Sequence, residues 1–124
     1  MNEQEMIRAI VKHTEYVKKH GLSFEGFEII QTKWFGRIIL ELCQQSPLRF
    51  GELKKRLPEI SNMVLTSALK SLAEKGLVER VQFNEIPPRV EYSLTENGIG
   101  MLPVAYELIR WEENYEPAFE NYKE

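Results

Sequence analysis

Several features that would define other classes of protein are missing from this chain. It has one cysteine, Cys43, so it cannot form an internal disulfide, as expected in a reducing compartment. No apolar run approaches the roughly 18–20 residues needed to cross a bilayer. The first residues, MNEQEMIRAIVKH, are too polar for a secretory signal peptide. We therefore expect a cytoplasmic protein with no membrane partner.

Motifs for catalysis and cofactor binding are also missing. The sequence has no nucleophile elbow, no glycine-rich phosphate loop and no closely spaced acidic pair with supporting residues. His13 and His20 lie seven residues apart without the cysteine or carboxylate partners of a metal site. Cys43 ends a predicted buried helix, where we interpret it as a small hydrophobic residue; redox sensing is the alternative. We expect no enzyme activity, no catalytic residue, no metal and no cofactor.

Charge is distributed unevenly along the chain. The formal net charge is −3, yet residues 33–90 carry ten Lys or Arg against six Glu. Residues 1–32 have a net charge of −1 and residues 91–124 a net charge of −6. A basic middle between acidic flanks is suited to present one face to a polyanion.

Both ends of the chain are predicted to be helical. Residues 4–20 place apolar side chains at helical spacing, and Gly21 ends this helix. Thr95 is predicted to cap a last helix through Trp111, which is kinked or restarted near Pro103 and apolar around much of its circumference. These surfaces exceed what one small domain can cover, so we expect the chain to be a homodimer.

The middle of the chain is predicted to form three helices and a hairpin. Apolar spacing gives helices over 33–44, 49–57 and 61–75, the last capped by Ser61 and ended by Gly76. Residues 77–94 are rich in β-branched and aromatic residues around a Pro87-Pro88 tip, which indicates a two-stranded ribbon. The expected fold is therefore α+β and mainly helical: a winged helix-turn-helix with a two-stranded β wing and N- and C-terminal dimerisation helices.

We expect three parts along the chain. Residues 1–23 form an N-terminal amphipathic dimerisation helix, residues 24–98 form the winged helix-turn-helix core, and residues 99–124 form a C-terminal dimerisation helix with an acidic tail.

The helix pair 49–57 and 61–75, joined by the turn Pro58–Ile60, is the candidate DNA-binding element. The second helix presents polar residues opposite its apolar stripe, and such a face fits a major groove. Its candidate DNA-contacting residues are Asn62, Thr66, Ser67 and Lys70. The basic run Lys54, Lys55 and Arg56 either contacts phosphates or is simply solvated. An ordinary packed helix pair with a solvated outer face is the alternative for the whole motif.

Two arginines are predicted to act in the wing. Arg80 and Arg89 are expected to lie near one another across the hairpin. Arg89, beside the Pro87-Pro88 tip, is expected to contact a phosphate or the minor groove. The alternative is that one of the arginines pairs with Glu79 or Glu91 on the ribbon surface.

Four stretches of the sequence resemble the HxlR-type winged-helix transcriptional regulators. They are KWFGRIILEL, PLRFGELKKRLPEIS, VLTSALKSLAEKGLVER and PPRVEYSLTENG, within residues 27–111. The resemblance implies a homodimer with terminal helices in its interface. It also implies two recognition helices in successive major grooves of a near-palindromic operator, with wings alongside. It further places Ser61 and Met63 on the recognition helix, Arg49 at the start of the preceding helix, and Pro88 with Arg89 in the wing.

The sequence departs from the family pattern in three places. Many relatives carry a basic residue where Met63 stands, which implies fewer phosphate contacts or a different operator. Redox-sensing members have a cysteine upstream of the KW helix, whereas Gly21–Ser23 contains none, which argues against thiol sensing there. Gln31-Thr32 replaces the usual Gly-Gly before KW.

The expected function is sequence-specific binding of double-stranded DNA by a homodimeric regulator. A small-molecule effector pocket is a hypothesis based on the aromatic residues Trp34, Phe35, Tyr106 and Trp111 near the expected dimer seam. The alternative is that these residues are interface core. A winged helix that docks a protein and never touches DNA is the rival function.

Overall fold

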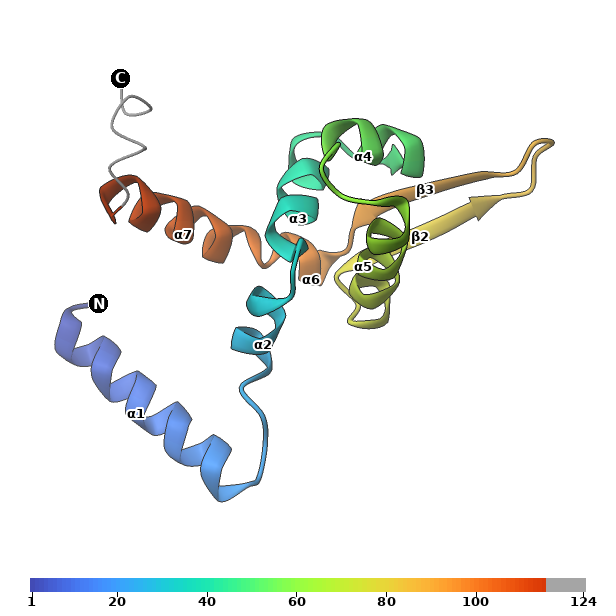
Figure 1. Ribbon diagram of the computed structural model, residues 1–124. Helices are drawn as coiled ribbons and strands as arrows, with labels where there is room; N and C mark the ends of the chain where they lie inside the picture. Colours follow the sequence, from blue (N-terminus) through green and yellow to red (C-terminus); the bar gives the residue numbers. More distant parts are fainter. Residues whose placement is uncertain (116–124) are drawn as a thin grey trace. The chain divides into compact units, whose positions relative to one another are not determined.

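A computed structural model describes residues 1–115 of the chain (Figure 1). Its elements are α1 (Glu3–Lys19), α2 (Glu25–Gln31), α3 (Phe35–Gln44), β1 (Leu48–Arg49), α4 (Phe50–Arg56), α5 (Asn62–Glu74), β2 (Val78–Phe83), β3 (Arg89–Leu94), α6 (Glu96–Ile99) and α7 (Leu102–Tyr115). They divide into two compact units, Met1–Thr32 and a second that begins at Lys33. The predicted division after residue 23 falls inside the first unit, and residues 116–124 of the predicted acidic tail lie outside the described residues.

The first unit contains α1 and α2. Asn2 caps α1 by accepting a hydrogen bond of 2.8 Å from the Glu5 N–H, and Gly21 follows the helix with a φ of +63°. The predicted α1 helix and its stop at Gly21 are therefore confirmed. Helix α2 was not predicted, because its seven residues are too short for a clear apolar period.

The core of the second unit lies between α3, α4, α5 and the sheet. On α3 the buried side chains are Phe35, Ile38, Ile39 and Leu42, which share one face at helical spacing. On α5 they are Leu65, Leu69 and Leu72, as the predicted apolar stripe requires. Leu48, Leu53, Leu57, Ile60, Leu77 and Val78 complete this core. Its assembly leaves the opposite side of α5 exposed.

The sheet has three antiparallel strands in the order β1-β3-β2. The two-stranded ribbon predicted from the sequence corresponds to β2 and β3, and β1 is an additional strand. The β2–β3 hairpin runs in register from Val78↔Leu94 to Phe83↔Arg89. β1 adds only Leu48 and Arg49, which are opposite Tyr92 and Glu91. Two residues are too few to show strand alternation in a sequence.

Both predicted N-caps are present. The Ser61 hydroxyl accepts a 3.2 Å hydrogen bond from the Val64 N–H, and the Thr95 hydroxyl accepts one of 3.1 Å from the Gly98 N–H. Gly76 ends α5 with a φ of +73°, a conformation that favours glycine. The last helix restarts near Pro103 as expected, since α6 ends at Ile99 and α7 begins at Leu102.

Thr95→Ala is expected to lower the free energy of unfolding by about 2 kcal/mol. The Thr95 hydroxyl also donates a 2.6 Å hydrogen bond to the Gly76 carbonyl, so it joins the end of α5 to the start of α6. Thr95→Ser keeps both bonds and should cost less than half as much. Urea denaturation measures both variants, and equal losses would contradict the role given to the hydroxyl.

Cys43 is exposed, so its predicted burial is wrong. It lies one residue beyond Leu42, about 100° around α3 from the buried face. Cys43 contributes instead to a groove of about 310 Å³ lined by Leu42, Ser46, Leu94, Ile99 and Leu102. Within residues 1–115, no helix is long and apolar enough to cross a membrane.

Candidate nucleic-acid interface

Helix α5 presents one polar face to solvent. Its exposed residues include Asn62, Met63, Thr66, Ser67 and Lys70, with the Met63 side chain 82% exposed. The first turn carries no acidic residue, so the positive end of the helix dipole is unopposed there. The Thr66 hydroxyl donates to the Asn62 carbonyl at 2.8 Å, which leaves its oxygen available only as an acceptor. This face can approach a polyanion.

A groove of about 430 Å³ lies between α5 and the hairpin. Its lining residues are Thr66, Leu69, Lys70, Ala73, Glu74, Arg80 and Tyr92. Arg80 and Tyr92 are register partners, so their side chains share the sheet face that meets α5. Lys70 and Arg80 thus line one groove from two different elements. The sequence alone did not select Tyr92, because only the strand register brings it beside Arg80.

The basic residues of α4 have different surroundings. Arg56 forms an ion pair with Glu41 at 3.3 Å and a hydrogen bond with the Gln45 side chain, so it joins α4 to α3. The Lys54 Nζ donates to the Pro58 carbonyl at 3.1 Å. Lys55 is exposed. Of the three, Lys55 is therefore the most available to an external anion.

Two acidic residues near the helix pair have partners in the chain. The Arg49 N–H donates a 2.9 Å hydrogen bond to the Glu52 carboxylate at the start of α4. Glu59 lies in the turn before α5. A hydrogen bond from the Glu59 backbone N–H lowers the pKa of the Glu59 carboxyl, and the ion pair with Arg37 lowers this pKa further. Glu59 therefore stays ionised, and Arg37 offsets its charge close to the start of α5.

Arg89 is bound within the wing. Its guanidinium lies 3.3 Å from the Glu85 carboxylate and 3.6 Å from that of Glu91. It also lies over the Phe83 ring, 4.1 Å from the ring centroid. The structure therefore contains the alternative pairing with Glu91, while DNA contact by Arg89 remains a prediction.

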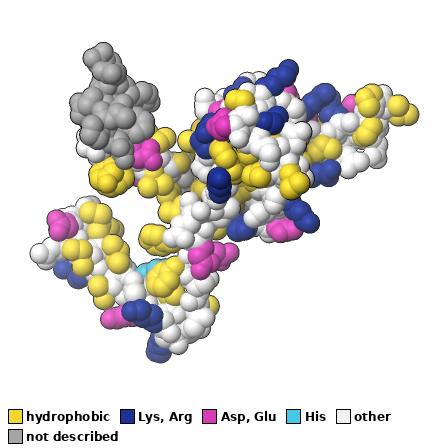
Figure 2. Space-filling model, viewed as in Figure 1, with side chains coloured by type: hydrophobic (Ala, Val, Ile, Leu, Met, Phe, Trp, Pro, Cys, Tyr) yellow, Lys and Arg dark blue, Asp and Glu magenta, His cyan; other side chains and the backbone are white. Residues whose placement is uncertain are grey.

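The expected closeness of Arg80 and Arg89 is wrong. Arg80 is opposite Tyr92 and Arg89 is opposite Phe83, so the two arginines occupy positions three residues apart on the ladder. Successive strand residues point to opposite faces, which places the two side chains on different faces of the hairpin. Figure 2 shows basic side chains over the helical part of this unit and hydrophobic side chains at the far end of the hairpin.

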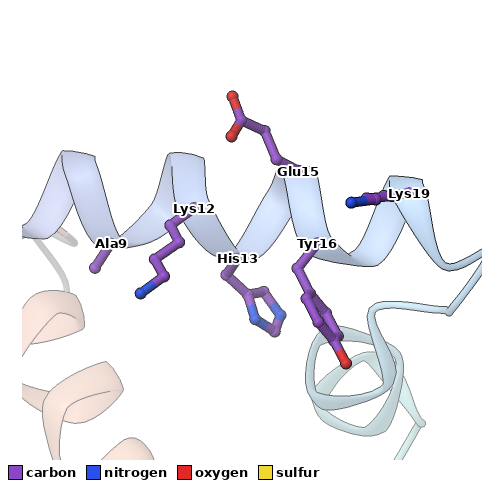
Figure 3. A pocket seen from close by; sticks show the side chains of 6 residues that line it. All are labelled: Ala9, Lys12, His13, Glu15, Tyr16 and Lys19. Carbon is purple, nitrogen blue, oxygen red and sulfur yellow. The ribbon is translucent and has the colours of Figure 1, made fainter.

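A shallow concavity of about 480 Å³ runs along α1, within the first unit. It is lined by Ala9, Lys12, His13, Glu15, Tyr16 and Lys19 (Figure 3). Glu15 points away from the side on which His13 and Tyr16 lie. In the part of the chain that the structure describes, no three His, Cys, Asp or Glu side chains are grouped to hold a metal ion.

The aromatic residues considered for an effector pocket are split between two environments. Phe35 belongs to the core and is 5% exposed, and Trp34 is half-buried beside it in sequence. Tyr106 and Trp111 are exposed on α7. Phe35 is therefore a core residue of the single chain, and the effector pocket stays a hypothesis.

Comparison with known proteins identifies the family. A family model described as HxlR-like helix-turn-helix matches residues 29–120. The chain belongs to this family. Membership confirms the family resemblance and the winged-helix fold predicted from the sequence. HxlR-like proteins are transcriptional regulators, not enzymes.

The relatives agree with this assignment. The HTH-type transcriptional regulator YkvN of Bacillus subtilis is 40% identical over 96 residues, which cover 77% of this chain and 80% of YkvN. The HTH-type transcriptional regulator BH0655 of Halalkalibacterium halodurans is 42% identical over 83 residues, 67% of this chain and 74% of BH0655. The reduced form of the transcriptional regulator YodB from B. subtilis has a TM-score of 0.69 at 33% identity, covering 76% of this chain and 91% of YodB. This HxlR-like protein is therefore a DNA-binding transcriptional regulator.

Proposed function

We propose that this HxlR-like protein acts in the cytoplasm as a homodimer that binds a near-palindromic operator, with one α5 helix in each of two successive major grooves. The observation that carries the proposal is the groove in which Lys70 of α5 and Arg80 of β2 lie together beside the exposed polar face of α5. Half-sites about one helical turn apart would fit two such helices related by a two-fold axis.

The contacts proposed for each protomer fall into two groups. Asn62, Met63, Thr66 and Ser67 would meet base edges in the major groove. The cations Arg49, Lys55, Lys70 and Arg80, all exposed, would meet phosphates. Lys54, Ser61 and Pro88 are proposed to lie at the margin of the contact. Phosphate contact by Arg89 would require it to give up its carboxylate partners.

The dimer is proposed from an apolar stripe on α7. Val104, Leu108, Trp111 and Tyr115 recur at helical spacing and are 42%, 43%, 57% and 62% exposed. On α1, Ile7, Ile10 and Val11 form a second exposed apolar cluster. Exposed apolar stripes of this kind are typical of interfaces between copies of a chain. The aromatic residues of α7 are then interface residues, and no effector is needed to explain them.

Leu108→Glu is expected to raise the dimer dissociation constant by roughly 10²-fold or more, because each protomer would then bury an unpaired carboxylate in the interface. Sedimentation equilibrium should give twice the chain mass of 14.6 kDa for the wild type and a single chain for the variant. Arg110→Glu, a charge change at an exposed polar position of the same helix, is the control and should remain dimeric. A monomeric wild type would contradict the proposed dimer.

Selection from a random pool of DNA duplexes tests the proposed function. The wild-type protein should enrich one near-palindromic sequence and bind it with two protomers per duplex, while unrelated competitor DNA fails to displace it. Met63→Lys is the informative variant, because a base-edge position on α5 should change the enriched sequence. Enrichment of no sequence would contradict the proposal and favour the protein-docking rival.

A further inference from the structure

The tip of the wing is exposed and carries a large aliphatic side chain. It joins β2 to β3 through residues 84–88, and all five are exposed. The Ile86 side chain is 103% exposed, so it contributes nothing to the core. Pro87 and Pro88 follow it and restrict the backbone. Figure 2 shows hydrophobic atoms at the far end of the hairpin. The most prominent side chain of the wing is therefore an aliphatic one.

The tip does not carry the charge expected of a phosphate-binding loop. Residues 84–91 contain two Glu and one Arg, a net charge of −1. The cation, Arg89, is only 28% exposed, since Glu85 and Glu91 flank it and the Phe83 ring lies against it. The cations of the wing face are instead at its base, where Arg80 shares a groove with Lys70.

Arg89 joins the two sides of the tip. Glu85 precedes the turn residue Ile86, whereas Glu91 lies on β3, and the Arg89 guanidinium is within 3.6 Å of both carboxylates. The Glu85 N–H also donates a 2.9 Å hydrogen bond to the Phe83 carbonyl, which tightens the start of the turn. These contacts and the two prolines restrict the backbone on both sides of Ile86.

We propose that Ile86 is the DNA-contacting residue of the wing tip, inserting its side chain into the minor groove beside the half-site, and that Arg89 is a positioning residue. The inference rests on the proposed function. Ile and Pro side chains are among the apolar groups that proteins insert into minor grooves, where sugar edges and base steps offer non-ionic contacts. Phosphate contacts stay with Lys70 and Arg80 at the base of the wing.

Ile86→Ser tests the contact on the duplex that the wild-type protein enriches from a random pool. The variant should bind roughly tenfold more weakly, because an apolar contact is lost in each protomer. The affinity of the variant should fall with salt concentration as steeply as that of the wild type, since no phosphate contact is removed. Ile86→Val, which keeps the tip apolar, is the matched control and should bind within about threefold of the wild type. Ile86 is exposed, so melting temperatures should not differ.

Arg89→Gln tests the positioning role with the same readout. Affinity should fall with an unchanged salt slope, and hydroxyl-radical protection of the minor groove beside the half-site should weaken, as it should in Ile86→Ser. A salt slope that is smaller in magnitude by about 2 for Arg89→Gln than for the wild type would overturn this role. Such a difference would mean that the variant has lost one direct phosphate contact in each protomer. Wild-type affinity and footprint in Ile86→Ser would overturn the wing-tip contact alone. Failure of the wild type to enrich any duplex would overturn the proposed function itself.

Discussion

Replacing Gly98 with alanine is expected to lower the free energy of unfolding by about 3 kcal/mol. Gly98 is buried in α6, and a Cβ built on it would overlap the backbone carbonyl oxygen of Leu77 and lie 3.3 Å from a Leu94 methyl carbon. The Leu77 carbonyl cannot move away freely, because it accepts a 3.1 Å hydrogen bond from the Thr95 N–H. Relieving the overlap would disturb the junction between α5, the sheet and α6.

Gly36→Ala is the matched control for this prediction. A Cβ at Gly36, on the exposed side of α3, meets no atom within 4 Å. Alanine there should raise stability by about 0.5–1 kcal/mol, since it reduces the freedom of the unfolded chain. Thermal unfolding followed by circular dichroism measures both variants. A Gly98→Ala protein as stable as Gly36→Ala would show that α6 does not pack closely against Leu77.

The double variant Lys70→Ala/Arg80→Ala is expected to bind the enriched operator roughly 10²- to 10³-fold more weakly at physiological salt. Two cations lost from each protomer remove about four phosphate contacts from a dimer, and each contact contributes through counterion release. Both side chains are exposed, so the free energy of unfolding should change by less than about 0.5 kcal/mol. Fluorescence anisotropy on the enriched duplex measures the loss of affinity.

A second double variant controls for net charge. Lys12→Ala/Lys19→Ala removes the same number of charges from exposed positions on α1, which contributes no residue to the proposed DNA face. It should keep nearly all of the affinity, apart from a small long-range electrostatic loss. Equal weakening by the two double variants would mean that overall charge, and not the groove beside α5, determines binding.

Local chemistry explains why much of the fold could be predicted from the sequence. The spacing of Leu65, Leu69 and Leu72 defined the buried face of α5, and the cap at Ser61 and the positive φ of Gly76 fixed its ends. These signals lie within one helix and its immediate neighbours. The predicted hairpin and the cap at Thr95 rest on equally local signals.

Features that depend on distant contacts could not be predicted in the same way. The strand Leu48–Arg49 exists only because β3 pairs with it, and the exposure of Cys43 depends on which side of α3 meets the core. The separation of Arg80 from Arg89 follows from the strand register. The sequence alone did not specify which residues of the two strands are opposite one another. For the same reason, candidate site residues could be chosen by type, whereas their partners could not.

The salt dependence of operator binding by the unaltered protein tests the central claim most directly. Four exposed cations in each protomer, Arg49, Lys55, Lys70 and Arg80, predict about eight phosphate contacts for a homodimer. The logarithm of the association constant should therefore fall against the logarithm of salt concentration with a slope of about −7, at two protomers per duplex. A slope near zero, or equal affinity for the enriched and unrelated duplexes, would contradict specific DNA binding through this face.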